Sequence, residues 1–225
     1  MAIFLAEPTT TNLYAGIRPI FMNLFKMRFS QTEIQHLLRA WIVISLSFAI
    51  LHNNGFSLTP GFLAAAAISA LTVGIGFLLH ELMHKYFAQK YGCHAEFRAF
   101  DFMLLIALLL ALFNSPVLFA APGAVFIHGN VNAARNGRIS AAGPATNIVL
   151  AFLFIGVKVL AGAVYSSQLL FSIASYGASV NAWLAVFNML PFMGLDGTKV
   201  LAWNLKAYTG LLVLAIGVMV LTFAI

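Results

Sequence analysis

Charged residues are scarce in this sequence. Only 8% of its 225 residues are Asp, Glu, Lys or Arg, whereas 62% are hydrophobic; a typical soluble domain has about 25% and 45–50%, respectively. So few charges cannot cover a surface that faces water, and the mean hydropathy is +0.95. The composition therefore excludes a soluble enzyme and a disordered chain, and it indicates a protein whose solvent is the lipid bilayer.

Cysteine is nearly absent as well. Because Cys93 is the sole cysteine, an internal disulfide is excluded. The Lys and Arg residues, 12 in all, raise the pI to about 9.7, but they are scattered along the chain. We interpret them as flanks of membrane spans, and we expect no nucleic-acid partner. Residues 1–30 lack the features of a cleavable signal peptide, so we expect the N-terminus to be retained.

Long apolar runs between turn signals predict an all-α polytopic membrane protein with about five transmembrane helices. The expected spans are residues 31–51, 60–92, 141–164, 169–190 and 208–225. A span needs about 20 residues, so we interpret the shorter apolar stretch within 102–119 as a re-entrant segment; six spans result if it crosses. Residues 1–30 are expected to form an interfacial segment, and residues 31–225 a single integral membrane domain.

The positive charges predict an orientation. With five spans and a cytoplasmic N-terminus, every Lys and Arg except Lys158 falls on the cytoplasmic side, as the positive-inside rule requires. A sixth span at 102–112 would move several of them outside. We therefore predict a multi-pass protein of the cell membrane with its N-terminus and the C-terminal end of its second span toward the cytoplasm.

Residues 80–84 read H-E-L-M-H within a predicted helix. Histidines four residues apart lie on one helical face, so His80 and His84 can bind one zinc ion while Glu81 reaches a water that the ion activates. A chance match is improbable with six histidines in the chain. The motif predicts a zinc site of the hydrolytic type.

A zinc site of this type needs a third protein ligand. Among the few acidic residues, Asp196 is the best candidate, because the predicted topology brings it out on the same membrane side as His84. It follows a stretch in which Pro and Gly interrupt the helix, so that the backbone there can approach a metal ion. Glu96 and Asp101, in the loop after the motif, are the alternatives.

Three motifs in this order resemble the site-2 proteases, a family of intramembrane zinc metalloproteases. They are H-E-L-M-H at 80–84, A-G-P-A-T-N at 142–147, and the run from Asn188 to the Asp-Gly pair at 196–197. The resemblance covers residues 60–205, the core of the membrane domain. It implies one zinc ion per chain, held by His80, His84 and Asp196, with Glu81 as the catalytic base. It also implies that Asn188 is a polar partner of the substrate or the oxyanion.

A short extended segment at residues 123–128 lies between glycines and is rich in β-branched and aromatic residues. We predict a β-strand or hairpin region near the active site, with this segment as an exposed sheet edge. The resemblance implies that a substrate is extended against this edge. The expected substrate-binding residues are Gly123, Ala124, Val125, Phe126 and Ile127.

These observations predict a zinc endopeptidase that hydrolyses a peptide bond in or near a transmembrane segment of a membrane protein, as in regulated intramembrane proteolysis. The expected partners are the bilayer and that substrate, whose helix must unwind to expose the bond. Two alternatives stay open. Buried His and carboxylate groups also line the paths of metal-ion transporters, and a catalytically inactive zinc-binding membrane adaptor would carry the same ligands.

Overall fold

The computed structural model describes residues 4–5, 21–24, 27–115, 122–165 and 167–225. Within this part, the structure has 5 helices that are long and apolar enough to cross a membrane. They are Gln31–His52, Pro60–Lys90, Ala133–Ala163, Gln168–Asn188 and Leu205–Ala224. The predicted class, a helical membrane protein with about five spans, is confirmed.

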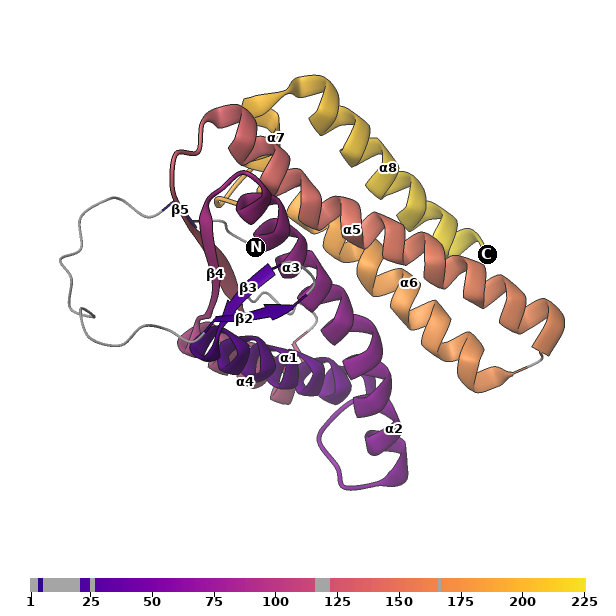
Figure 1. Cartoon of the computed structure of the whole chain (residues 1–225). Helices are drawn as coiled ribbons and strands as arrows, with labels where there is room; N and C mark the ends of the chain where they lie inside the picture. The colour runs from indigo at the N-terminus through magenta and orange to yellow at the C-terminus, as the bar shows by residue number, and fades with distance from the viewer. Residues whose placement is uncertain (1–3, 6–20, 25–26, 116–121, 166) are drawn as a thin grey trace.

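One group of helices forms an elongated slab. Helices α5 (Ala133–Leu160), α6 (Gln168–Asn188) and α8 (Leu205–Ala224) run side by side (Figure 1) and contact one another. The short helix α7 (Asp196–Trp203), which the sequence did not predict, packs against α5 and α8. This slab supplies the C-terminal half of the molecule.

The other group surrounds the second span. That span consists of α2 (Pro60–Ser69), a π-helical turn (Ala70–Gly74) and α3 (Ile75–Lys90). Helix α1 (Gln31–His52) packs against α2, the π-helical turn and α3, and α3 also contacts α5 of the slab. Helix α3, which carries H-E-L-M-H, is therefore the element shared by both groups.

Side-chain caps set where several helices begin. The Ser30 hydroxyl accepts from the backbone N–H of Glu33 at 3.1 Å, and Thr59 caps α2 with a proline at its first position. Asn132 caps α5 by accepting from the N–H of Arg135 at 2.9 Å. The third span therefore begins its helix well before residue 141, where the apolar pattern had placed it.

The stretch that we interpret as re-entrant contains a helix too short to span. Helix α4 (Asp101–Leu112) has 12 residues and packs against α1, and Arg39 of α1 pairs with Asp101 at 2.6 Å. Residues 116–119, the end of the expected re-entrant segment, lie outside the described residues. The described part agrees with a segment that does not cross.

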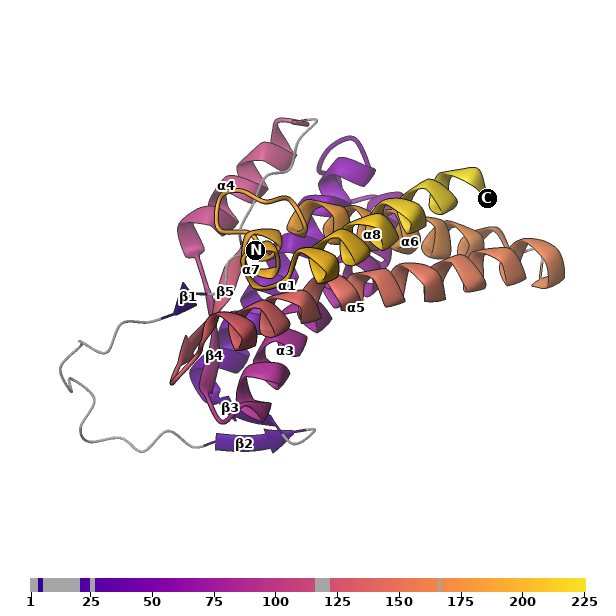
Figure 2. The ribbon, with the colours of Figure 1, turned by 90° about the horizontal axis from the view of Figure 1, so that it is seen from above.

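A three-stranded sheet follows the second span. Strand β4 (His94–Ala99) pairs antiparallel with β5 (Gly123–His128), and β1 (Phe4–Leu5) pairs with the opposite side of β5, so the order is β1-β5-β4 (Figure 2). The strand at 123–128 is thus present, but the prediction that it is an exposed edge is wrong. It is the central strand, and most of its residues are buried.

A separate hairpin precedes α1. Strands β2 (Phe21–Leu24) and β3 (Met27–Ser30) pair antiparallel within the expected interfacial segment. The rest of that segment, apart from β1, lies outside the described residues. Its location at a membrane surface stays a prediction.

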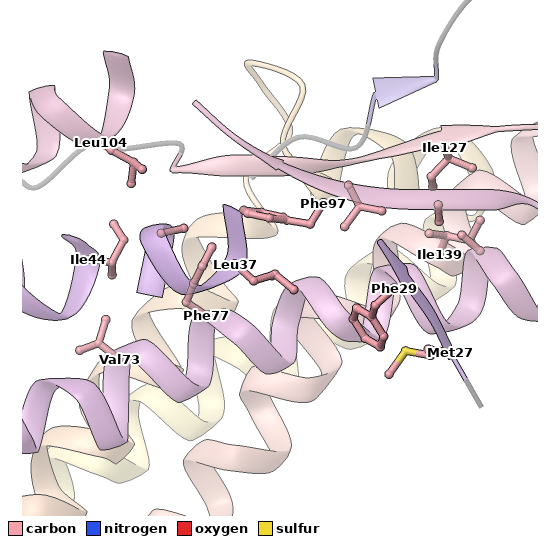
Figure 3. Close-up of a cluster of buried hydrophobic side chains, with 14 of the residues drawn as sticks. Met27, Phe29, Leu37, Ile44, Val73, Phe77, Phe97, Leu104, Ile127 and Ile139 are labelled. Atoms are coloured by element: carbon pink, nitrogen blue, oxygen red, sulfur yellow. The ribbon is translucent and has the colours of Figure 1, made fainter. Parts of the chain in front are cut away.

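The main hydrophobic core joins the sheet to the helices. Phe77 of α3 packs edge to face against Phe97 of β4, with ring centroids 5.8 Å apart. Around them lie Leu37 of α1, Ile127 of β5 and Ile139 of α5 (Figure 3). This core fixes the sheet against the helix that carries H-E-L-M-H.

A buried ion pair strengthens the same junction. Lys85 Nζ donates to Glu33 Oε2 at 2.8 Å and to the carbonyl of Ala95 at 2.6 Å, and Glu33 Oε1 accepts from the N–H of Phe97 at 2.9 Å. Both side chains are buried. Their mutual bonds offset part of the cost of burying the charges, and they join α1, α3 and β4.

Candidate metal centre

Two histidines and one aspartate meet in the interior. His80 Nε2 and His84 Nε2 lie 3.2 Å and 3.1 Å from Asp196 Oδ2, and all three side chains are buried. The histidines come from α3 and the aspartate from the first residue of α7. Helical spacing brings the two histidines together, and the contact of α5 with both α3 and α7 brings in the aspartate.

The donor set fits zinc. Ligand atoms at about 2.0–2.1 Å from one tetrahedral zinc are about 3.3 Å apart, close to the two nitrogen–oxygen distances here. One Asp196 oxygen, Oδ1, is buried with no hydrogen-bond partner in the described part of the chain. A carboxylate binds zinc in its deprotonated form, so Asp196 can supply the negative charge that the two neutral histidines lack.

The other ring nitrogens show which tautomer each histidine adopts. His84 Nδ1 lies 2.8 Å from the carbonyl of Ile139, and His80 Nδ1 lies 2.5 Å from Asn147 Oδ1. Because both partners are acceptors, each Nδ1 carries the proton and each Nε2 keeps its lone pair. Metal-binding histidines have this arrangement.

The Asn147 side chain is held in turn by α6 and α3. Its Nδ2 donates to Asn181 Oδ1 at 2.9 Å and to the carbonyl of Gly76 at 3.3 Å, and Asn181 Nδ2 donates to the carbonyl of Gly177 at 2.9 Å. In each of these bonds the donor is the group nearer His80 along the network, and the acceptor is the group farther from it. Together these bonds fix the amide of Asn147 so that its oxygen faces the imidazole.

Glu81 lies beside this cluster, and one of its carboxylate oxygens makes no hydrogen bond to the residues that the structure describes. This oxygen, Oε1, is 4.0 Å from His80 Nε2. The side chain is only 1% exposed. A buried carboxylate oxygen without a hydrogen-bond partner is costly, and this one lies next to the donor set.

Gly143 lets α5 approach the two histidines. A Cβ atom at this position would lie 2.5 Å from His80 Nε2 and 2.5 Å from His84 Nε2. No side chain fits there without moving the donor atoms. The A-G-P-A-T-N motif therefore contributes twice, through the missing side chain of Gly143 and through the amide of Asn147.

The alternative third ligands lie elsewhere. Glu96 pairs with Arg98 at 2.9 Å and accepts a hydrogen bond from Ser30, while Asp101 pairs with Arg39. Asn188 ends α6, is buried, and donates through Nδ2 to the carbonyl of Leu184 at 2.8 Å. Within the described residues, the structure thus brings together the predicted His80, Glu81, His84 and Asp196, and no other group of His, Cys, Asp and Glu gathers in this way.

Sequence reasoning missed the role of Asn147 and the surroundings of Lys85. The A-G-P-A-T-N motif does not by itself reveal that the Asn147 amide faces His80, and nothing near Lys85 in the sequence indicates that its side chain is only 1% exposed. The spacing of Asn147 from Gly143, one helical turn, places both on one face of α5, and the structure shows that this face meets the histidines. For Lys85 the sequence holds no local signal, because its partner Glu33 is 52 residues away.

We expect Asn147→Leu to weaken zinc binding about 10- to 100-fold, as loss of an outer-shell partner does in other zinc sites. The substitution removes the acceptor that holds His80 Nδ1. Thr146→Val is the matched control, because among the described residues the Thr146 hydroxyl bonds only to the carbonyl of Ala142 in its own helix. Competition with a chelator measures the affinity, and equal affinity in Asn147→Leu and wild type would contradict this role.

Comparison with known proteins points to the class of protein to which this chain belongs. The sequence is 40% identical over 184 residues to a protein of Methanocaldococcus jannaschii named "Putative zinc metalloprotease", and the match covers 81% of this chain and 89% of the relative. It is 28% identical over 123 residues to Rip3 of Mycobacterium tuberculosis, which has the same description; here 54% of this chain and 27% of Rip3 are covered.

No family model matches the sequence, and no solved structure gives a significant match. The first relative nevertheless matches over nearly its whole length, and the motifs carry the donor set that such an enzyme needs. The chain therefore belongs to the site-2 protease family of zinc metalloproteases.

Proposed function

We propose that this protein is an intramembrane zinc endopeptidase, which hydrolyses a peptide bond in or near a transmembrane segment of another membrane protein. The observation that carries the proposal is the convergence of His80, His84 and Asp196 beside the unpartnered carboxylate oxygen of Glu81. The histidines lie in a helix long and apolar enough to cross the bilayer. Hydrolysis at that depth requires a substrate that is itself in the membrane.

In this proposal one zinc ion per chain is held by His80 Nε2, His84 Nε2 and Asp196. When bound, zinc acts as a Lewis acid that polarises a carbonyl and makes water a stronger acid. Glu81 accepts the proton of the attacking water and passes it to the nitrogen of the leaving amine as the carbon–nitrogen bond breaks. The partners of the two Nδ1 atoms keep both imidazoles oriented while the proton moves.

The substrate is proposed to bind as an extended strand along β5, over Gly123, Ala124, Val125, Phe126 and Ile127. Pairing with a strand replaces the helical hydrogen bonds that the substrate loses as it unwinds. Asn188, eight residues before Asp196 in sequence, is proposed to bind a carbonyl oxygen of the substrate or the oxyanion. The proposed orientation has the N-terminus and the active site toward the cytoplasm.

A reconstituted cleavage assay tests the proposal. We expect cleavage of a single-span substrate with Gly-Pro near its cytoplasmic end to exceed cleavage of the Leu-Leu version about 10-fold, because Gly and Pro lower the cost of unwinding by about 1–3 kcal/mol. A chelator should stop both reactions. Equal cutting of the two substrates would reject the need for unwinding, and no cutting of either would reject the endopeptidase.

Cysteine labelling tests the orientation. Native Cys93 is buried, so we expect the informative sites to be Asn130→Cys and Leu58→Cys, both exposed, in a Cys93→Ser background. They lie on opposite sides of the predicted topology. A membrane-impermeant thiol reagent added to intact cells should label only the Leu58→Cys protein, and labelling of Asn130→Cys from outside would invert the orientation.

A further inference from the structure

The strand proposed to bind the substrate has one side left after β4 is paired. Strand β4 pairs with β5 over its whole length, from His94 opposite His128 to Ala99 opposite Gly123. A strand has two hydrogen-bonding sides, so a substrate that extends along β5 must use the other one. That side is the one on which β1 lies.

Strand β1 occupies the end of this side. Phe4 is opposite Phe126 and Leu5 is opposite Ile127, and the two strands run parallel. Phe126 and Ile127 belong to the segment along which the substrate is proposed to extend. The backbone groups that face β1 cannot bond to a second strand at the same time, so β1 and a substrate exclude each other at these two positions.

We propose that the chain's own N-terminal segment at Phe4–Leu5 is a resident competitor of the substrate on the side of β5 opposite β4. This proposal rests on the proposed function, because it concerns the same binding strand. It identifies that side of β5 as a docking surface for extended chain, which Phe4–Leu5 covers until a longer strand displaces it.

The pairing of β1 is suited to displacement. It joins 2 residues of β1 to β5, whereas β4 contributes 6, and parallel pairs are slightly less stable per residue than antiparallel ones. A substrate strand that pairs along residues 123–127 makes more backbone bonds than β1 does. It can therefore replace β1 without disturbing β4.

Strand β5 does not need β1 for its own position. It is held by β4 along its length, and Ala124, Val125 and Ile127 are buried in contact with the rest of the fold. Release of β1 should leave the sheet and the thermal stability of the protein unchanged. An unchanged melting temperature after release of β1 would therefore distinguish competition with the substrate from a structural role of β1.

The test compares two double variants at the same positions. Phe4→Pro with Leu5→Pro removes both backbone N–H donors and disfavours the strand conformation. Phe4→Ala with Leu5→Ala changes the side chains and keeps the donors. We expect the proline variant to lower KM for the single-span substrate about 3- to 10-fold with kcat unchanged, the range that corresponds to loss of one or two backbone hydrogen bonds. The alanine variant should keep the wild-type KM.

A binding measurement separates this proposal from the proposed function. In a Glu81→Gln background, fluorescence anisotropy reports the dissociation constant of the labelled substrate without any cleavage. The proline variant should bind about 3- to 10-fold more tightly than the alanine variant, and a synthetic peptide of residues 1–8 should reverse the gain. A proline variant that binds the substrate no more tightly than the wild-type N-terminus does, or a gain that the peptide does not reverse, would overturn the competition even if cleavage proceeds as proposed.

Discussion

Replacing Glu81 with Gln should lower kcat about 10²- to 10⁴-fold, the usual contribution of a general base, while bound zinc stays at the wild-type level. Gln has nearly the same size and shape, so the donors His80, His84 and Asp196 keep their surroundings. The Glu81 oxygen that faces this cluster has no hydrogen-bond partner among the described residues, so its loss breaks no structural contact. The rate falls because an amide cannot accept the proton of water.

Asp101→Asn is the matched control for this variant. It also converts a carboxylate to an amide, but Asp101 is exposed and pairs with Arg39 at the start of α4. Its cleavage rate should stay within about 2-fold of wild type, since exposed pairs contribute little. Elemental analysis gives the zinc content, and zinc flux into vesicles tests the transporter alternative. Wild-type cleavage by Glu81→Gln would refute the proposed proton transfer, and zinc flux in both proteins would favour a transporter.

Replacing Gly143 with Ala should lower zinc affinity about 100-fold or more, at or beyond the upper end of outer-shell effects. The new methyl group would lie 2.5 Å from the Nε2 atoms of His80 and His84. Neither ring can turn away without giving up the hydrogen bond at its Nδ1. The donor atoms must therefore move apart, and cleavage should fall with the zinc content.

Gly156→Ala is the control within the same helix. A Cβ atom at Gly156 would meet nothing within 4 Å, and Ala favours a helix over Gly by about 1 kcal/mol. This variant should keep its zinc and unfold at the same or a slightly higher temperature. If Gly143→Ala also retained full zinc and wild-type cleavage, the close approach of α5 to the histidines would have no functional importance.

The features that the sequence predicted well are those with local causes. The caps at Ser30 and Thr59 lie where turn chemistry puts them, and the facing of His80 and His84 follows from helical spacing. Glu33 lies where it could complete a capping box with Ser30, but its side chain bonds to Lys85 and to the backbone of Phe97. A partner that lies in a distant element outcompeted the local one.

The features that were hard to predict depend on contacts between residues that are far apart in the sequence. Asp196 could be proposed as a ligand only through topology, because it is 112 residues from His84. The pairing of β1 with β5 leaves no periodic signal, since two residues are too few to show a strand pattern. No local pattern in one sequence reveals such contacts, because they arise only when the whole chain has folded.

The buried pair of Glu33 and Lys85 also bears on how the enzyme can move. It joins α1, α3 and β4 into one rigid body that carries two of the three metal donors, whereas Asp196 belongs to the slab of α5–α8. Any hinge motion that parted the two bodies would pull the donors apart, so spin labels on α3 and α7 should keep their separation when substrate binds. If the protein cleaves transmembrane helices as proposed, the substrate would enter by displacing elements that carry no donor, such as α4 or β1, while the three donors stay together.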